Sequence, residues 1–351
     1  MLFVYTLKTE QGKESRKIIM VYVSRVFCVV CMFAVGISAQ MTDKRSEIAI
    51  AASYNAPNIV PDKAMSDVLG PAIRSTLKDF EAKGLKSEDV AATLIDVSDP
   101  KRLRISSFRG DAAIYPASVV KMFYMAALER QLEDGKIKMT PELERGLRDM
   151  IVDSSNEATQ YILDVITGTS SGAELPQKEF EAWQYKRNRV NRWYSSMGYT
   201  NINVNQKTFC EDAYGIEQQS RGYKGQNRNM LTTNATARLL AEIVTGRINT
   251  PSRTTAMMDL MKRDPFGKAA DGDDQNNGFT GKLFIDRNIR DVKLWSKAGW
   301  TSKTRHDAAY IETADGLKFV LVIFTENHAI DREIIPAIAG KIIDKLRKVK
   351  K

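Results

Sequence analysis

The sequence predicts an α+β fold, in which an antiparallel sheet is built from both ends of the chain, flanked by helices and interrupted by an inserted all-helical subdomain. Apolar runs with strand patterns occur before residue 110 and again after residue 290, whereas the chain between them shows helical periodicity. The strand patterns lie at 91–97, 103–108, 294–300, 308–313 and 319–325. This order of elements favours one domain, residues 40–351, with the helical subdomain at about 118–265.

The first elements follow from local signals. Apolar residues recur at helical spacing over 67–83, and Gly84 ends that helix. The first two strands are expected to form a hairpin, because Asp99 and Pro100 mark a turn between them. The next helix contains Ser118.

The helical subdomain continues with segments that two loops, 168–176 and 201–229, separate from one another. The predicted helices are 141–153, 156–166, 180–197, 233–245 and 251–262. A loop rich in Gly, Asp and Asn at 267–281 then leads into the three later strands, and a final helix is expected at 331–349.

Residues 1–39 have the pattern of a secretory signal peptide. Basic residues precede the apolar run 26–36, and small residues follow up to Ala39. The run is shorter than the roughly 20 residues that span a bilayer. We therefore expect a secreted or periplasmic protein without a stable membrane span, with a retained N-terminal anchor as the alternative. Translation from Met20 would shorten the signal.

Composition argues against several classes of function. The chain has 52 basic and 43 acidic residues, a net charge of +9, without the basic stripe interleaved with aromatic residues that indicates nucleic-acid binding. This moderate positive charge suits an anionic substrate. His306 and His328 are the only histidines, which excludes a multi-histidine zinc site, and Gly-rich phosphate loops are absent. No metal or cofactor is expected.

Two other short patterns do not predict function. Cys28 and Cys31 lie in the apolar run and would leave with the signal, so Cys210 alone remains and no internal disulfide can form. The run 168–172 matches the letters of a Gly-x-Ser-x-Gly nucleophile elbow, but it lies between two predicted helices, whereas an elbow needs a strand before it.

Ser118 and Lys121 are the leading catalytic candidates. Residues three apart on a helix share a face, so the lysine can take the proton that makes a serine hydroxyl a good nucleophile. Pro116 is favoured at a first helical position, which places Ser118 in the first turn, where free N–H groups favour an oxyanion. The flanking residues are apolar, so this helix should be buried. A chance Ser-x-x-Lys with a solvated lysine is the simpler alternative.

Two further pairs of residues suit the same site. Ser154 and Asn156 stand at the start of a predicted helix, where Ser and Asn are also ordinary caps. Lys297 and Gly299 lie on the first of the later strands. A lysine there can hold a substrate carboxylate and a glycine permits close approach, although lysines on edge strands also discourage aggregation.

Together, the three pairs resemble the three signatures of class A β-lactamases and penicillin-binding proteins. They read, in chain order, Ser118-x-x-Lys121, Ser154-x-Asn156 and Lys297-x-Gly299. The resemblance covers about residues 64–350, because the expected order of strands and helices also matches the β-lactamase/transpeptidase-like fold. It implies a secreted serine hydrolase that opens β-lactam rings through an acyl-enzyme and so confers antibiotic resistance.

The resemblance also implies a role for each residue. Ser118 would be acylated, with Lys121 as its base or proton relay, and Ser154 would pass a proton to the leaving nitrogen. The backbone N–H groups of Ser118 and Trp300 would form the oxyanion hole. The substrate would be held by Asn156, Lys297, Gly299, Trp300, Thr301 and Arg305.

The sequence departs from the family pattern in four ways. The stretch between the first two signatures is shorter than usual. Ser155 stands where Asp is usual, and Ala298 stands where the hydroxyl of a Thr or Ser would bind the substrate carboxylate, a role that Thr301 or Ser302 could fill. The Glu-x-x-Leu-Asn run, whose Glu and Asn activate the deacylating water, is missing.

The deacylating base would then come from the loop 201–229. Glu211 is our candidate, with Asp212 and Glu217 as alternatives, and all three could instead be solvated loop carboxylates. Two other functions therefore stay open: a D,D-peptidase acting on peptidoglycan stem peptides, and a slowly deacylating penicillin-binding sensor domain. In each case we expect a monomer whose partner is a small β-lactam or a peptidoglycan peptide.

Overall fold

The computed structural model describes residues 47–209 and 212–350. Contacts divide the chain after Glu47, so the structure described below is that of the second unit, Ile48–Lys351. The expected signal segment, residues 1–39, lies outside the described residues. Within the described ranges, no helix has both the length and the apolar character that are needed to cross a bilayer.

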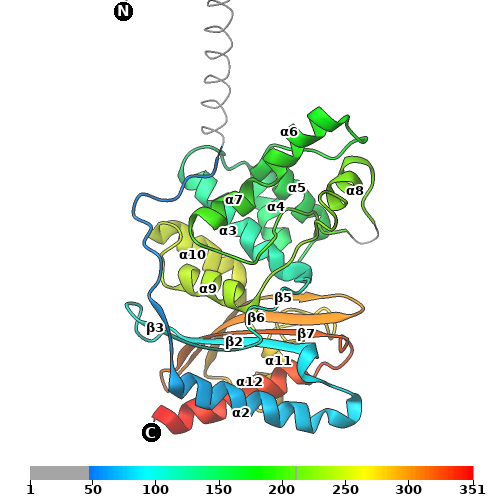
Figure 1. Cartoon of the computed structure of the whole chain (residues 1–351). Helices are drawn as coiled ribbons and strands as arrows, with labels where there is room; N and C mark the ends of the chain where they lie inside the picture. Colours follow the sequence, from blue (N-terminus) through cyan, green and yellow to red (C-terminus); the bar gives the residue numbers. More distant parts are fainter. Residues whose placement is uncertain (1–46, 210–211, 351) are drawn as a thin grey trace, which may run out of the picture. The chain divides into compact units, whose positions relative to one another are not determined.

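A seven-stranded sheet forms the middle layer of this unit (Figure 1). Its strands come from both ends of the chain, as predicted, in the order β1-β3-β2-β7-β6-β5-β4. Neighbouring strands are antiparallel, except that β1 and β3 are parallel. The bounds are β1 Ile59–Pro61, β2 Val90–Asp96, β3 Leu103–Phe108, β4 Lys262–Arg263, β5 Val292–Trp300, β6 Thr304–Thr313 and β7 Lys318–Glu326.

The central strands are buried on both faces, because alternate side chains enter two separate apolar cores. On β7, Val320 and Val322 belong to the core under the helical subdomain. Leu321 and Ile323 belong to the core on the opposite face. The strand therefore reads as a continuous apolar run in the sequence rather than an alternating one.

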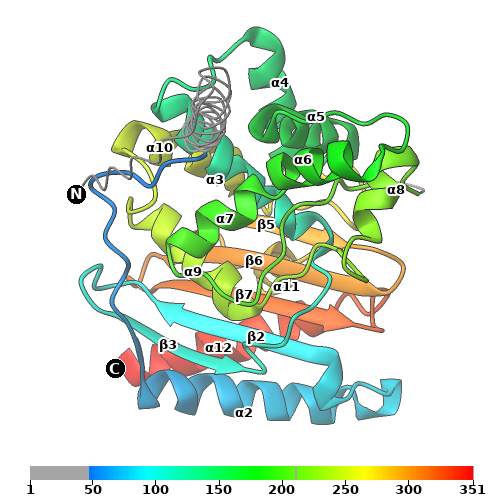
Figure 2. The same cartoon turned by 45° about the horizontal axis from the view of Figure 1, so that its top comes forward.

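Three helices cover one face of the sheet: α2 Lys63–Asp79, α11 Thr280–Asp286 and α12 Ile334–Lys350. Helix α2 begins earlier than predicted, because the side chain of Asp62 accepts a hydrogen bond from the backbone N–H of Met65 and caps the helix. Figures 1 and 2 show α2 and α12 side by side below the sheet.

The other helices form the inserted subdomain on the opposite face (Figures 1 and 2). Their bounds are α3 Val120–Glu133, α4 Pro141–Ile151, α5 Asn156–Thr167, α6 Gln177–Arg187, α7 Arg189–Ser196, α8 Gly215–Arg221, α9 Thr233–Val244 and α10 Pro251–Met261. Every residue of α3 from Val120 to Leu132 is buried, as the apolar residues around Lys121 predict, and the charged Glu129 and Arg130 are buried with them.

The single helix expected at 180–197 is in fact two helices, α6 and α7, which meet at Asn188. The side-chain oxygen of Asn188 accepts hydrogen bonds from the side-chain amides of Asn191 and Asn205. Such local side-chain bonds compete with a continuous helix. The structure also contains β1, β4, α8 and α11, which are too short to show a periodic pattern in the sequence.

Candidate active site

Ser118 lies in a 3₁₀ turn, Ala117–Val119, that leads directly into α3. Ala117 has a φ of 47°, in the left-handed region that costs energy for a residue with a Cβ atom. Strand β5 packs tightly on this turn, because a Cβ atom on Gly299 would lie 2.8 Å from Ser118 N and 2.8 Å from Pro116 O. Only glycine fits there, so β5 fixes the position of the Ser118 turn.

A fully buried histidine on β6 holds the residues before Ser118. His306 Nε2 lies 3.0 Å from the carbonyl oxygen of Tyr115, and Nδ1 accepts a hydrogen bond of 3.1 Å from the backbone N–H of Thr325. Because Nδ1 is an acceptor, the ring proton belongs on Nε2, which donates to Tyr115. Burial lowers the pKa of His306 to about 4, so the ring is neutral at physiological pH.

Ser118 opens into a cavity of about 830 Å³, a size usual for small-molecule sites. The cavity lies between the helical subdomain and the β5 side of the sheet. Its lining includes Ser118, Val152, Asp153, Ser154, Asn156, Phe209, Asp271, Asp273, Asp274, Gln275, Ala298, Gly299, Trp300, Thr301 and Ser302.

Lys121 is fully buried in the first turn of α3. Its Nζ donates hydrogen bonds to Asn156 Oδ1 at 2.9 Å, to Ser154 Oγ at 3.3 Å and to the carbonyl oxygen of Ser154. The lysine therefore joins α3 to the start of α5. This arrangement differs from the solvated lysine of a chance Ser-x-x-Lys.

The three residues 154–156 divide two tasks. Ser155 is the N-cap of α5, since its Oγ accepts a hydrogen bond of 3.0 Å from the backbone N–H of Ala158. Ser154 and Asn156 line the cavity instead. Ser154 has a φ of 58°, so this part of the site, like Ala117, keeps a strained backbone.

Lys297 is fully buried on β5, behind the cavity lining. Its Nζ donates to Ser154 Oγ at 2.9 Å, to the side-chain oxygen of Gln275 at 2.6 Å and to the carbonyl of Ala298 at 2.9 Å. Burial, and then the positive charges of Lys121 and Arg263, hold the pKa of Lys297 well below its ordinary value. The hydroxyl of Ser154 thus lies between two buried lysines.

Gln275 is a site residue that the sequence did not reveal. Its Oε1 also accepts from the backbone N–H of Ala298 at 3.2 Å, and its Nε2 donates to the carbonyls of Ile151 at 3.1 Å and Val152 at 2.8 Å. Gln275 therefore connects Lys297 and β5 to the end of α4. The polar loop 267–281 gave no spacing signal that could have singled out this residue.

The remaining predicted residues of β5 and β6 separate into two groups. Trp300, 53% exposed, and Thr301 line the cavity. Thr301 also closes the turn into β6 through hydrogen bonds to Thr304. Arg305 is 2% exposed and lies outside the cavity lining. Its guanidinium pairs with Asp273 at 2.7 Å and therefore anchors the loop that carries Gln275.

No glutamate lines the cavity among the residues that the structure describes. Glu211 lies outside the described residues. Asp212 is exposed. The backbone N–H of Ala213 donates to its carboxylate, Arg221 at the end of α8 forms an ion pair with it, and both contacts lower its pKa.

Glu217 is buried in the helical subdomain, away from the cavity lining. It accepts hydrogen bonds of 2.8 Å from both terminal nitrogens of Arg187, and Lys207 lies 3.3 Å away. Burial opposes its ionisation, but these two cations hold its pKa below the ordinary value. Glu217 therefore stabilises the fold around α8 and is unsuited to activate a water in the cavity.

Comparison with protein families gives one match. The model described as the beta-lactamase enzyme family matches residues 140–346, which include the second and third sequence signatures and begin after Lys121. A comparison of the sequence with curated proteins gives no match.

Solved structures show the same fold. A β-lactamase from Sphaerobacter thermophilus has a TM-score of 0.56 at 19% identity, covering 79% of this chain and 96% of its own. A β-lactamase from Chitinophaga pinensis has a TM-score of 0.55 at 15% identity, covering 78% and 98%. PBP-A has a TM-score of 0.54 at 15% identity, covering 84% and 100%. At these identities the likeness establishes the fold alone.

Proposed function

The chain belongs to the beta-lactamase enzyme family, and from this premise we propose that it is a serine hydrolase that opens β-lactam rings through an ester on Ser118. One observation carries the proposal. Two buried lysines, Lys121 and Lys297, both donate to the hydroxyl of Ser154, beside a cavity into which Ser118 opens. Two lysines that are buried from solvent and share one serine hydroxyl suit proton transfer, whereas a lysine on the surface would simply be solvated.

Acylation moves one proton from the serine to the lactam nitrogen. The step starts from a form of the protein in which Lys121 has given up its proton. Lys121 then takes the proton of Ser118 Oγ as that oxygen bonds to the lactam carbonyl carbon. The C–N bond then breaks, and Ser154 Oγ gives its proton to the departing nitrogen. Lys121, 3.3 Å from Ser154 Oγ, returns the proton that it took, so the chain of transfers closes.

The oxyanion and the substrate carboxylate are bound from the β5 side. The close contact between Gly299 and the Ser118 turn supports an oxyanion hole formed by the backbone N–H groups of Ser118 and Trp300. A substrate carboxylate would lie in the cavity, next to the wall behind which Lys297 supplies positive charge. Gln275, and not a hydroxyl at Ala298, fixes this lysine.

Release of the ester requires a water and a base. We assign Glu211 as the base: it takes a proton from the attacking water as the water oxygen bonds to the ester carbonyl carbon. The ester C–O bond then breaks, Glu211 gives the proton to Ser118 Oγ, and the opened product leaves as a carboxylic acid. The sequence pattern of residues 1–39 supports export, so the reaction would take place in the periplasm or outside the cell.

A second candidate is a penicillin-binding enzyme that acts on peptidoglycan stem peptides and deacylates β-lactams slowly. The observation that favours it is the absence of a glutamate from the described part of the cavity lining. The acylation steps are the same for both candidates, and they differ only in how fast the ester is hydrolysed.

The purified protein, a Ser118→Ala variant and a Ser195→Ala control on the surface of α7 should be compared with a chromogenic cephalosporin and a fluorescent penicillin. We expect turnover that Ser118→Ala abolishes and Ser195→Ala leaves unchanged. Glu211→Gln should trap a labelled adduct. A long-lived adduct in the unaltered protein selects the penicillin-binding candidate, and no labelling at all contradicts both.

A further inference from the structure

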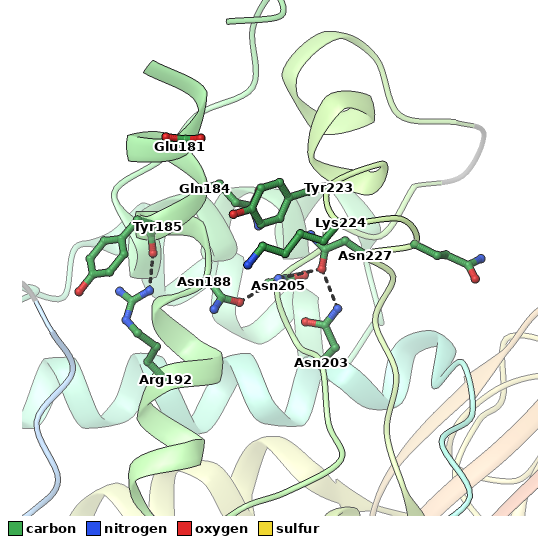
Figure 3. A pocket seen from close by; sticks show the side chains of 11 residues that line it. Glu181, Gln184, Tyr185, Asn188, Arg192, Asn203, Asn205, Tyr223, Lys224 and Asn227 are labelled. Atoms are coloured by element: carbon green, nitrogen blue, oxygen red, sulfur yellow. Dashed lines mark hydrogen bonds between the residues drawn. The ribbon is translucent and has the colours of Figure 1, made fainter. Parts of the chain in front are cut away.

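A second cavity, of about 520 Å³, lies in the helical subdomain between helices α6 and α7 and the loop that follows α8 (Figure 3). It shares no lining residue with the Ser118 cavity. Its lining consists of amides, tyrosines and charged groups, namely Glu181, Gln184, Tyr185, Asn188, Arg192, Asn203, Asn205, Tyr223, Lys224, Gln226 and Asn227. A lining without aliphatic side chains suits a polar ligand.

The floor of the pocket is held rigid by asparagines that bind one another. Asn205 Nδ2 donates to Asn188 Oδ1 at 3.0 Å and to Asn227 Oδ1 at 3.1 Å. Asn203 Nδ2 donates to the same Asn227 oxygen at 2.8 Å. These bonds fix the asparagine side chains before any ligand arrives, which reduces the entropy lost on binding.

The side-chain amides of Gln184 and Asn188 have N–H groups that can donate to a ligand. Gln184 is 3% exposed, and its side-chain oxygen accepts from Ser220 Oγ at 2.7 Å. Asn188 uses its side-chain oxygen in the same way. Across the ranges 47–209 and 212–350, the side-chain nitrogens of Gln184 and Asn188 have no hydrogen-bond partner, although both residues line the pocket.

Lys224 supplies a cation to the same space. Figure 3 shows its side chain extended across the pocket toward Asn188. Its ammonium lies 5.4 Å from the ring centre of Tyr223 and makes no ion pair with any described residue. Its φ of 52° is unfavourable for a residue with a Cβ atom, so the loop holds Lys224 in a strained backbone conformation.

The charges and rings at the rim complete the pocket. Arg192 is a second cation in the lining, and Glu181 is the only carboxylate among the described lining residues, so the net charge is positive. The ring of Tyr223 packs edge-on against Phe180, with centres 5.6 Å apart, and so presents a fixed aromatic surface. Donors, a cation and an aromatic surface therefore converge on one volume.

We propose that this pocket binds an anionic sugar, that is, a hexose ring that carries a carboxylate or a phosphate. The amides of Gln184 and Asn188 donate to sugar hydroxyls, and the Tyr223 ring covers a C–H face of the ring. Lys224 pairs with the anionic group through a charge-assisted hydrogen bond. The pocket uses none of the residues assigned to acylation. The sugar-binding proposal and the Ser118 proposal can therefore fail independently of each other.

Calorimetric titration of the full protein with glucuronate, glucose 6-phosphate, glucose and inorganic phosphate tests the proposal, because the three sugars share one ring. At least one anionic sugar should bind saturably, about tenfold or more tighter than glucose and than phosphate alone. The carboxylate and the phosphate arms then show which anion the pocket prefers.

Lys224→Met should weaken that binding by about tenfold, and Lys224→Arg should restore most of it. Lys224→Gly removes the same ammonium while relieving the backbone strain, so it repeats the test in a variant whose fold is favoured. Lys186→Met, an exposed residue of α6 outside the lining, is the matched control and should bind like the unaltered protein. Equal binding of glucose, equal binding of phosphate alone, no saturable binding, or no effect of Lys224→Met overturns the proposal.

Discussion

At the residue scale, the hydroxyl of Ser154 is the group on which both buried lysines converge. The convergence depends on Ser155, because that neighbour caps α5 and leaves Ser154 to face the cavity. It also depends on Gln275, which accepts a hydrogen bond from Lys297 and holds it against the end of α4. We therefore expect Gln275 to act as a positioning residue for Lys297.

Replacing Gln275 tests this role. Gln275→Leu removes an acceptor from a buried ammonium, which should lower the pKa of Lys297 further, move the alkaline limb of the acylation rate to lower pH and slow acylation about tenfold. Gln275→Glu should move the limb to higher pH, because a carboxylate stabilises the charged lysine. Gln218→Leu on the surface of α8 is the control. If both Gln275 variants keep the original pH profile, Gln275 has only a structural role.

How much of the site the sequence could predict depends on the elements that carry it. Ser118 and Lys121 are three residues apart, and helical spacing placed both in the first turn of one helix. In the structure Lys121 lies in the first turn of α3, whereas Ser118 lies in the 3₁₀ turn just before it. Gln275 and Arg305 depend on how the loop 267–281 folds. The same loop holds Asp273, a lining residue that pairs with the buried Arg305, and no pattern of spacing encodes that pairing.

At the scale of elements, the contact between β5 and the Ser118 turn sets the position of Ser118. The atoms nearest to a Cβ on Gly299 all belong to the backbone, so the turn or the strand would have to move to admit one. The long helices and the strands of the sheet were predictable from the sequence. Burial imposes a regular pattern on many residues, whereas elements such as β4 and α8 bury too few.

Gly299→Ala should therefore displace the Ser118 turn and slow acylation by about 100-fold, since small misplacements of reacting groups are costly. The unfolding free energy should also fall, because the new methyl group lies within 3 Å of three backbone atoms. Gly172→Ala is the matched control, since a Cβ atom there meets nothing within 4 Å. Unchanged acylation in Gly299→Ala would show that the contact does not position the nucleophile.

At the scale of the whole molecule, the order of strands brings distant parts of the sequence to one site. Strand β6 lies between β5 and β7, and its His306 joins the Ser118 turn to Thr325 of β7. The Ser118 turn is thus held by strands that follow it by almost two hundred residues. We therefore expect both the stability of the fold and the activity at Ser118 to depend on His306 being neutral.

The unfolding free energy should fall in acid for this reason. The pKa of His306 is about 4 in the folded protein and 6.5 when unfolded, so its contribution is complete above pH 6.5 and is lost as the pH falls toward 4. The loss amounts to about 3 kcal/mol. His306→Gln keeps a donor to Tyr115 without a titrating ring. Urea unfolding at pH 4.5 and 7 should show a smaller pH dependence in this variant, and equal dependence would refute the assignment.

The central claim is that Ser118 carries the acyl group, and the mass of the acylated protein tests it most directly. The protein should be mixed with benzylpenicillin, quenched in acid within seconds, digested and analysed by mass spectrometry. We predict one added penicillin, on the peptide that contains Ser118, and none in the Ser118→Ala variant. An adduct on another residue, equal labelling of Ser118→Ala, or no adduct at the earliest times would contradict the account.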